Sequence, residues 1–232
     1  MPILGSIIKG AIDLRGRIPA RKNVYKQQVK QLRKLLKKAE DTEFGRHYGF
    51  SNMLLEEDPI KTFQKKVPIS DYQSIFDAWW HKAIKGEKDI CWPGKINYFA
   101  LSSGTSESSS KHIPITKDMI KAIQRGTVKQ ILSTRHFNFS KEQYETEVLF
   151  VGGSTNLYFN GIYFSGDLSG ITTGTQPRLF SGFSLPGPEI RAQKDWEIKL
   201  QMMVDNAKNW NVGFICGVPA WIQILFERII KQ

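Results

Sequence analysis

The chain has 232 residues, of which 41% are hydrophobic, enough for a packed globular core. It carries 33 Lys and Arg residues against 22 Asp and Glu residues, a net charge of +11. No apolar run reaches the roughly 18 residues of a membrane-spanning helix. The two isolated cysteines, Cys91 and Cys216, indicate neither a disulfide framework nor a zinc site, and we expect a protein of the reducing cytoplasm.

Most of the positive charge lies in the first 40 residues, which hold 11 basic residues and 2 acidic ones, a net charge of +9. Their apolar positions at helical spacing predict a helix that packs by one face and exposes its lysines: Val29, Leu32, Leu35, Leu36 and Ala39. A solvated helix face is the favoured interpretation. Weak contact of the Ile-rich first 18 residues with a membrane surface is the alternative. Because Tyr25 is the only aromatic residue among these 40, no series of bases could stack between the lysines, and we do not expect nucleic-acid binding.

Beyond residue 40, helical and strand patterns alternate. Helices are predicted at 68–85, with Ser70 or Asp71 as N-cap, and from Thr116 to about Arg135. Two further helices are predicted, one capped by Asp195 and one with Pro219 in its first turn. Strands are predicted at 97–101, 148–151 and 212–216. Residues 152–190, rich in Gly, Ser, Thr, Pro and aromatic side chains, predict an ordered but irregular segment. This order indicates an α/β fold with a mostly parallel sheet and helices on its faces.

A polar loop follows the strand at 97–101. Ser102, Ser103, Gly104, Thr105 and Ser106 supply hydroxyls and backbone N–H groups, Lys111 supplies one cation, and Pro114 is expected to end the loop. Such a combination is typical of a phosphate cradle. It lacks the Gly-Lys-Ser/Thr of a P-loop, the repeated glycines of a dinucleotide fold and the flanking glycines of a serine nucleophile. On composition alone, a flexible surface loop is the alternative.

Several segments in matching order resemble one enzyme family. Residues 102–114 resemble the first signature of the acyl-adenylating enzymes. Further segments resemble the plant auxin-responsive Gretchen Hagen family and its bacterial relatives: residues 2–9, 43–49, 92–101, 165–169, 195–197 and 215–221. By this resemblance the chain is identified as a bacterial member of that family of acyl acid–amido synthetases.

The resemblance implies a ligase with the fold of the adenylate-forming enzymes. A carboxylic acid would attack the α-phosphorus of ATP, and an amine or amino acid would then take the acyl group. The resemblance implies phosphate binding by Ser102, Ser103, Gly104, Thr105 and Ser106, with Lys111 as the catalytic cation. Magnesium would be the second cofactor, its ligand lying outside this chain, and no resident metal site is expected within it.

The segment Gly217-Val218-Pro219 resembles a family segment near the acyl pocket, which implies a substrate-binding role. It follows a strand, where open α/β sheets bind ligands. The alternative is a plain strand–turn–helix connection with Pro219 in the first helical turn.

Members of this family are longer than this chain. We therefore expect residues 1–232 to be the N-terminal part of the large ATP- and acyl-acid-binding domain, with a basic helical arm at 1–40 and without the C-terminal domain. The expected signatures for magnesium and ribose are missing, so the truncated chain alone is expected to be inactive. A non-catalytic remnant that keeps the fold and binds a ligand or partner is the alternative.

Overall fold

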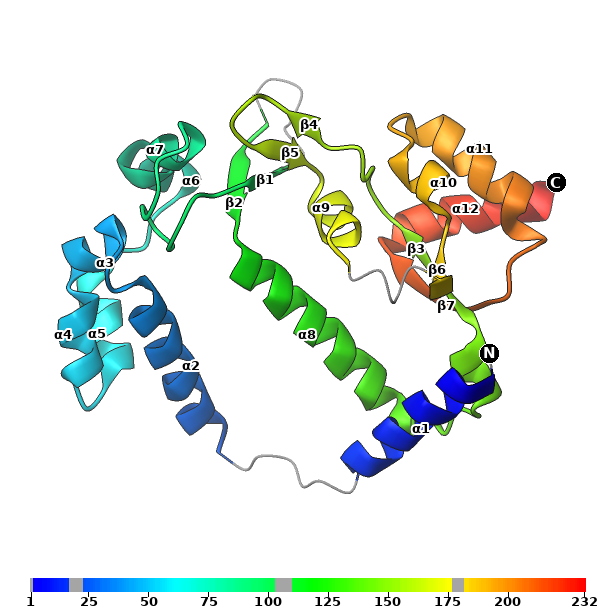
Figure 1. Cartoon of the computed structure of the whole chain (residues 1–232), viewed down its shortest axis with the longest axis horizontal. Coiled ribbons are helices and arrows are strands. Elements are labelled where there is room, and N and C mark those ends of the chain that lie inside the picture. Colours follow the sequence, from blue (N-terminus) through cyan, green and yellow to red (C-terminus); the bar gives the residue numbers. More distant parts are fainter. Residues whose placement is uncertain (1, 17–22, 103–109, 177–181) are drawn as a thin grey trace. The chain divides into compact units, whose positions relative to one another are not determined.

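The computed structural model describes residues 2–16, 23–102, 110–176 and 182–232 (Figure 1). The chain divides into two compact units. Unit 1 combines Met1–Pro19, Lys117–Tyr158 and Ser165–Gln232, whereas unit 2 combines Ala20–Thr116 and Phe159–Phe164. Each unit has its own buried clusters of apolar side chains.

Unit 1 contains a three-stranded parallel sheet in the order β6-β3-β7, made of β3 (Glu147–Val151), β6 (Ser184–Leu185) and β7 (Val212–Gly217). Its helices are α1 (Pro2–Gly16), α8 (Lys117–Ser133), α9 (Leu168–Gly174), α10 (Pro188–Ala192), α11 (Trp196–Ala207) and α12 (Pro219–Lys231). Two short 3-10 helices, η2 (Thr134–Phe137) and η3 (Glu142–Glu145), precede β3. The parallel sheet and the helices α8, α11 and α12 agree with the predicted pattern.

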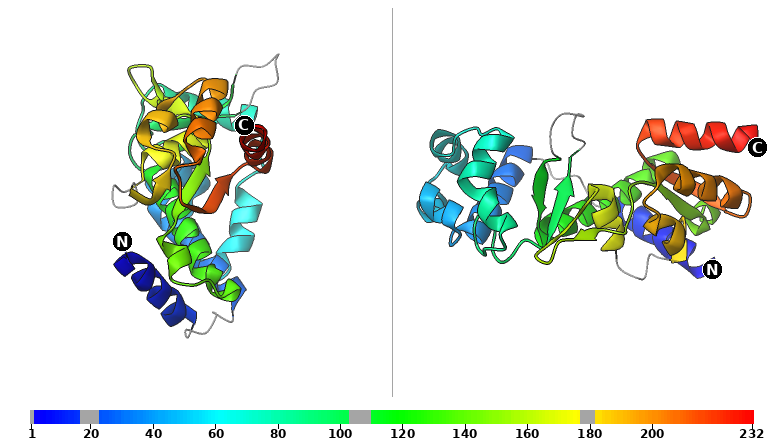
Figure 2. Two further views of the ribbon diagram at one scale, coloured as in Figure 1. Left: turned by 90° about the vertical axis from the view of Figure 1, so that its right-hand side faces the viewer. Right: turned by 90° about the horizontal axis from the view of Figure 1, so that it is seen from above.

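The core of unit 1 lies where the sheet meets α10, α11 and α12. Its buried side chains are Leu149, Val151, Leu185, Ile190, Leu200, Met203, Val204 and Leu225. Helices α11 and α12 run side by side (Figures 1 and 2). The Asp195 carboxylate caps α11 by accepting a hydrogen bond from the Ile198 N–H at 3.0 Å, and Pro219 occupies the first turn of α12.

Unit 2 begins with five helices: α2 (Val24–Ala39), α3 (Glu43–Tyr48), α4 (Phe50–Leu55), α5 (Pro59–Lys66) and α6 (Tyr72–Ile75). The π-helix η1 (Phe76–Trp80) and α7 (His81–Ile84) continue α6, and Asp71 caps this stretch through a bond from the Ser74 N–H at 2.8 Å. The prediction of a helix at 68–85 with Asp71 as a possible N-cap is thereby confirmed.

A four-stranded sheet follows in the order β2-β1-β5-β4, made of β1 (Tyr98–Leu101), β2 (His112–Ile115), β4 (Tyr158–Phe159) and β5 (Phe164–Gly166). Strands β1 and β2 pair antiparallel, with Phe99 opposite Pro114. The antiparallel pairing of β1 and β2 departs from the mostly parallel sheet that the sequence predicts, and Pro114 lies within a strand instead of ending the loop. A proline is tolerated there because β2 is an edge strand.

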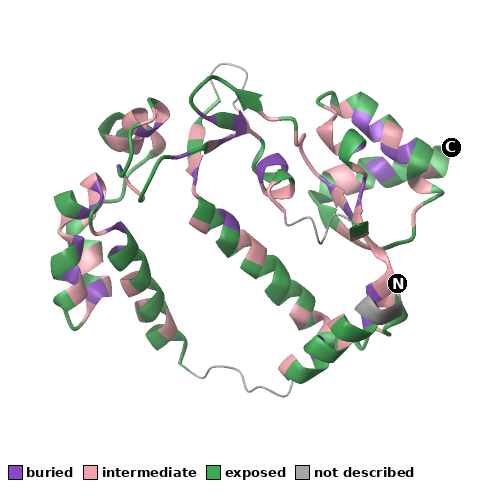
Figure 3. Ribbon diagram, viewed as in Figure 1, coloured by how far each residue is buried: buried purple, intermediate pink, exposed green. Residues whose placement is uncertain are grey.

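Helix α2 buries one face, as its spacing predicts. Leu36 and Ala39 are buried, whereas Leu35, predicted on the packed face, is 42% exposed. Lys26 and Lys30 lie on the exposed face, which is green in Figure 3. The exposed placement of these lysines agrees with a solvated helix face.

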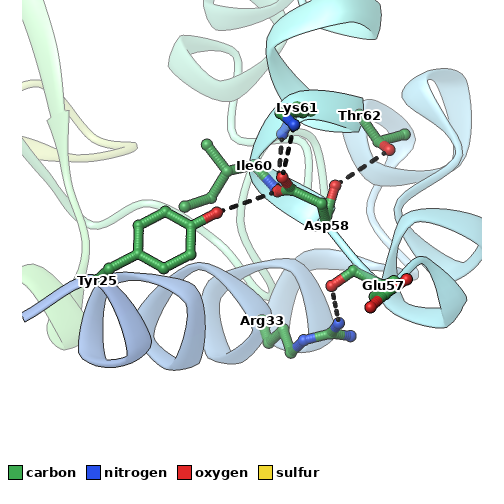
Figure 4. A network of polar contacts seen from close by, with 7 residues as sticks. All are labelled: Tyr25, Arg33, Glu57, Asp58, Ile60, Lys61 and Thr62. Carbon is green, nitrogen blue, oxygen red and sulfur yellow. Dashed lines mark hydrogen bonds and ion pairs between the residues drawn. The ribbon is translucent and has the colours of Figure 1, made fainter. Parts of the chain in front are cut away.

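A polar network joins α2 to the start of α5 (Figure 4). The Asp58 carboxylate accepts hydrogen bonds from the Ile60 and Lys61 N–H groups, both at 3.2 Å, and so caps α5. The Tyr25 hydroxyl donates to Asp58 at 3.5 Å, and the Arg33 guanidinium donates to the carbonyl oxygen of Glu57 at 3.3 Å. Arg33 is thus tied to the neighbouring loop.

Helix α1 belongs to unit 1, where it contacts η3 and α8. Ile12 is buried, whereas Ile7 and Leu14 are 60% and 63% exposed. Among the described residues, no helix is both long and apolar enough to cross a membrane. Membrane-surface contact by this segment stays a prediction.

Candidate functional site

The polar loop is the connection of an antiparallel hairpin. Leu101 of β1 pairs with His112 of β2, and the Ser102 N–H donates to the Lys111 carbonyl oxygen at 3.1 Å immediately beyond that pair. The structure thereby brings two predicted site residues, Ser102 and Lys111, together at the foot of the loop. The other four, Ser103, Gly104, Thr105 and Ser106, lie outside the described residues.

The Lys111 side chain is exposed, and its ammonium lies over an aromatic ring. Lys111 Nζ is 5.1 Å from the ring centroid of Tyr72, at the start of α6. Hydrogen bonds from Ser74 are the main cause of a lowered pKa of the neighbouring Asp71 carboxyl, and the charge of Lys111 lowers that pKa further. The cation therefore lies in a weakly negative environment and remains open to solvent.

Tyr72 also holds the backbone at the foot of the hairpin. Its hydroxyl accepts a hydrogen bond from the His112 N–H at 3.0 Å and lies 3.5 Å from the His112 carbonyl oxygen. Sequence reasoning missed this residue, because Tyr72 and His112 are 40 positions apart and nothing in the helical pattern at 68–85 connects them. Only the tertiary packing of α6 against the hairpin identifies it.

The second predicted region lies in unit 1, at the carboxyl end of β7. Gly217 ends the strand, Val218 is the N-cap of α12, and Pro219 is its first residue; all three are exposed. A Cβ atom on Gly217 would lie 2.5 Å from the Val151 carbonyl oxygen, so β7 approaches β3 closely here. This geometry confirms the strand–turn–helix connection, and acyl-acid binding by these residues stays a prediction.

A buried lysine that sequence reasoning missed fixes the carboxyl end of β3. Lys199 of α11 is 3% exposed, and its ammonium donates to the carbonyl oxygens of Gly152 (2.9 Å), Gly153 (3.0 Å) and Arg191 (3.3 Å). Burial lowers the pKa of Lys199 to about 8, and the nearby Asp167 carboxylate opposes this shift. Because carbonyl oxygens occupy its donors, Lys199 is suited to hold the chain and poorly suited to bind an anion.

The backbone that follows β3 is closely packed against the side chains of Asp167 and Ser169. The Gly153 N–H donates to the Ser169 hydroxyl at 2.9 Å, and a Cβ atom on Gly153 would lie 2.3 Å from the Asp167 carboxylate. Asp167 is the N-cap residue of α9, without a side-chain capping bond. Gly153 therefore leaves room for the Asp167 carboxylate near Lys199.

Two cavities lined by described residues lie apart from the predicted site residues. One of about 190 Å³ in unit 2 is lined mainly by apolar side chains, among them Trp80, Cys91 and Trp92. One of about 610 Å³ in unit 1 is lined among others by Leu149, Trp210 and Phe226. In the described part of the chain, no three His, Cys, Asp or Glu residues gather as a metal site would require.

The chain combines a parallel sheet with helices packed against it, the α/β class of fold that its sequence predicts. A family model described as the GH3 family N-terminal domain matches residues 19–187. That range is well over half of the chain, and the chain belongs to the GH3 family, the Gretchen Hagen family that the sequence resembles.

Two solved structures share the fold. A GH3.15 acyl acid amido synthetase matches with a TM-score of 0.65 and 16% identity, over 98% of this chain and 38% of that one. An AtGH3.15 acyl acid amido synthetase in complex with 2,4-DB matches with a TM-score of 0.63 and 17% identity, over 100% and 39% of the respective chains. The chain thus spans less than two fifths of either protein. No curated protein matches it.

Proposed function

We propose that this chain supplies the polyphosphate-binding part of an ATP-dependent acyl acid–amido ligase. In the reaction of the longer parent protein, an oxygen of the acid's carboxylate bonds to the α-phosphorus of ATP, and the bond to the leaving pyrophosphate breaks. An amine or amino acid then attacks the acyl carbon and releases AMP. The cytoplasm, where ATP is abundant, is the proposed location.

One observation carries the proposal. In a chain of the GH3 family, the Ser- and Thr-rich loop connects β1 to β2, with the exposed cation of Lys111 at its foot. Charge builds on the pyrophosphate as it leaves, and a mobile ammonium stabilises that charge. Residues 102–106 are proposed to bind the phosphates and Lys111 to act on the leaving group. Gly217, Val218 and Pro219 are proposed, on the family resemblance, to border the acid.

The described residues fit a polyphosphate better than a metal ion. Lys111 offers an exposed ammonium, whereas no described group of three acidic, His or Cys residues lies together. We propose that magnesium accompanies ATP and that its protein ligand lies outside this chain. We assign no reaction step to it here.

A non-catalytic role is the second candidate. The chain covers under two fifths of the solved relatives, so it is also consistent with a fold that binds a ligand or partner without completing adenylation. In either case we expect the 232-residue chain to bind polyphosphate through Lys111 and not to turn it over.

Titration of the 232-residue chain with Mg-ATP, followed by calorimetry, tests the proposal. We expect Lys111→Gln to weaken binding about tenfold or more, because a charge-assisted hydrogen bond to phosphate is lost. Lys95→Gln, an exposed lysine of the same unit, is the matched control and should bind as the wild type does. Equal binding by the Lys111→Gln variant would refute the assignment.

Catalysis by the chain alone is measured separately, as ATP–pyrophosphate exchange with a panel of carboxylic acids. We expect no exchange above background. Exchange that depends on an added acid would contradict the expectation that this chain alone does not complete adenylation, and it would identify the acid.

A further inference from the structure

Tyr72 contacts both the backbone and the cation at the foot of the β1–β2 hairpin. Its hydroxyl accepts a hydrogen bond from the His112 N–H at 3.0 Å, at the first residue of β2. Its ring lies 5.1 Å from Lys111 Nζ. One side chain of α6 therefore fixes the start of β2 and the position of the neighbouring ammonium.

The ring of Tyr72 is itself held in place. It stacks on Phe76 at a centroid distance of 5.6 Å and meets Trp80 edge-on at 5.9 Å. Aromatic pairs of this geometry restrict ring motion and stabilise the packing. The surface beneath Lys111 is thus pre-formed by α6 and η1, which follow one another directly along the chain.

The contact between the Lys111 ammonium and the Tyr72 ring is weak enough for a phosphate group to replace it. Lys111 forms no ion pair with any residue in the described part of the chain, and a cation over a ring at an exposed site is favoured only about two- to fivefold. A phosphate oxygen offers a charge-assisted hydrogen bond, which is considerably stronger. A polyphosphate would therefore displace the ring as the partner of this ammonium.

We propose that Tyr72 is a positioning residue for Lys111. Its hydroxyl fixes the backbone at His112. Its ring contacts the ammonium until a polyphosphate binds and replaces the ring as the partner of the ammonium. The inference rests on the proposed function, because it takes Lys111 as the cation that meets the phosphates. Tyr72 itself makes no contact with the nucleotide in this arrangement.

The ring contact is tested by NMR without nucleotide. The Lys111 side-chain methylene signals are assigned by their loss in Lys111→Gln, and the ring current of Tyr72 is expected to shift them upfield. The shift should persist in Tyr72→Phe, which keeps the ring, and disappear in Tyr72→Leu. Tyr25→Leu is the control, since Tyr25 is 58% exposed on α2. Identical Lys111 signals in the wild type and Tyr72→Leu would overturn the inference.

The replacement of the Tyr72 ring by phosphate as the partner of Lys111 is tested by titration with inorganic triphosphate and with Mg-ATP. Tyr72→Phe loses only the hydroxyl that fixes His112 and should bind about two- to tenfold more weakly than the wild type. Tyr72→Leu also loses the competing ring and should bind about two- to fivefold more tightly than Tyr72→Phe. A purely structural role predicts the reverse order, because leucine is the more disruptive replacement.

The two proposals fail in different ways. If Tyr72→Leu binds polyphosphate more weakly than Tyr72→Phe does, phosphate does not replace the ring at Lys111, but the proposal that the chain binds polyphosphate still stands. If the wild type binds neither triphosphate nor Mg-ATP, both the proposed function and the replacement of the ring by phosphate are refuted. The NMR comparison still decides whether Tyr72 positions Lys111.

Discussion

At the scale of single residues, Lys199 shows how a charge is accommodated in the core of unit 1. Three carbonyl oxygens surround its ammonium, at 2.9, 3.0 and 3.3 Å. Removing a charged group from water is unfavourable, and hydrogen bonds to carbonyl oxygens offset part of this effect. The lowered pKa of about 8 reflects the remainder. From α11, Lys199 joins the neighbouring α10 to the end of β3, which lies 47 residues earlier in the chain at Gly152.

The stability of unit 1 should depend on the protonation of Lys199. The pKa is about 8 in the folded chain and near 10.4 in an unfolded one, so between these values the unfolded chain holds more protons. Raising the pH therefore favours the folded state: we expect the unfolding free energy to gain about 2 kcal/mol from this group between about pH 7 and pH 9.5. Urea unfolding of the wild type and of Lys199→Met measures it as a difference. A pH-independent difference would refute the assigned pKa.

At the scale of elements, the carboxyl end of β7 depends on a glycine. A Cβ atom at Gly217 would lie 2.5 Å from the Val151 carbonyl oxygen and 3.0 Å from the Val151 Cβ atom. Backbone atoms of a paired strand cannot move aside as a flexible side chain can. The close pairing of β3 and β7 at this end thus requires the absence of a side chain.

Gly217→Ala should destabilise unit 1 by about 1–3 kcal/mol, because the added Cβ would clash with the backbone of β3. The matched control is Gly126→Ala in the middle of α8, where nothing lies within 4 Å of the added Cβ. It should stabilise the helix by up to about 1 kcal/mol. Thermal unfolding followed by circular dichroism measures both variants. If they had equal melting temperatures, the steric explanation would be wrong.

The sequence predicts elements well where the signal is local. Asp195 and Asp71 are found as N-caps, and the strand at 148–151 is found as β3 at Glu147–Val151. It fails for β2, because Pro114 indicates a break, and only pairing at a sheet edge makes a proline acceptable. The same holds for the functional residues. Lys111 can be predicted from its motif, whereas Tyr72 and Lys199 cannot, because they act through contacts between segments that are distant in sequence.

At the scale of the whole molecule, the two units have separate cores. Leu200 is fully buried in the cluster of unit 1, and Leu36 is 1% exposed in a cluster of unit 2 made from α2 and α4. The buried clusters contain no member of the other unit. A defect in one core should therefore act mainly on its own unit.

Leucine-to-alanine substitutions in the two cores test this independence. Leu200→Ala and Leu36→Ala should each lower the stability of their own unit by about 2–5 kcal/mol. Hydrogen exchange followed by mass spectrometry should show faster exchange in α11 and β3 for the first variant, and in α2 and α4 for the second. Equal acceleration throughout the chain in both variants would show that the units unfold as one.

The division of the chain between the units has a consequence for its synthesis. Helix α1 leaves the ribosome before its partners η3 and α8, which are encoded more than 100 residues later. At about 5–20 residues per second, the apolar side chain of Ile12 would wait several seconds for its contacts. Most of unit 2 would emerge within that interval. Helix α1 is thus made well before its partners, and a chaperone that binds short apolar segments would meet it during this delay.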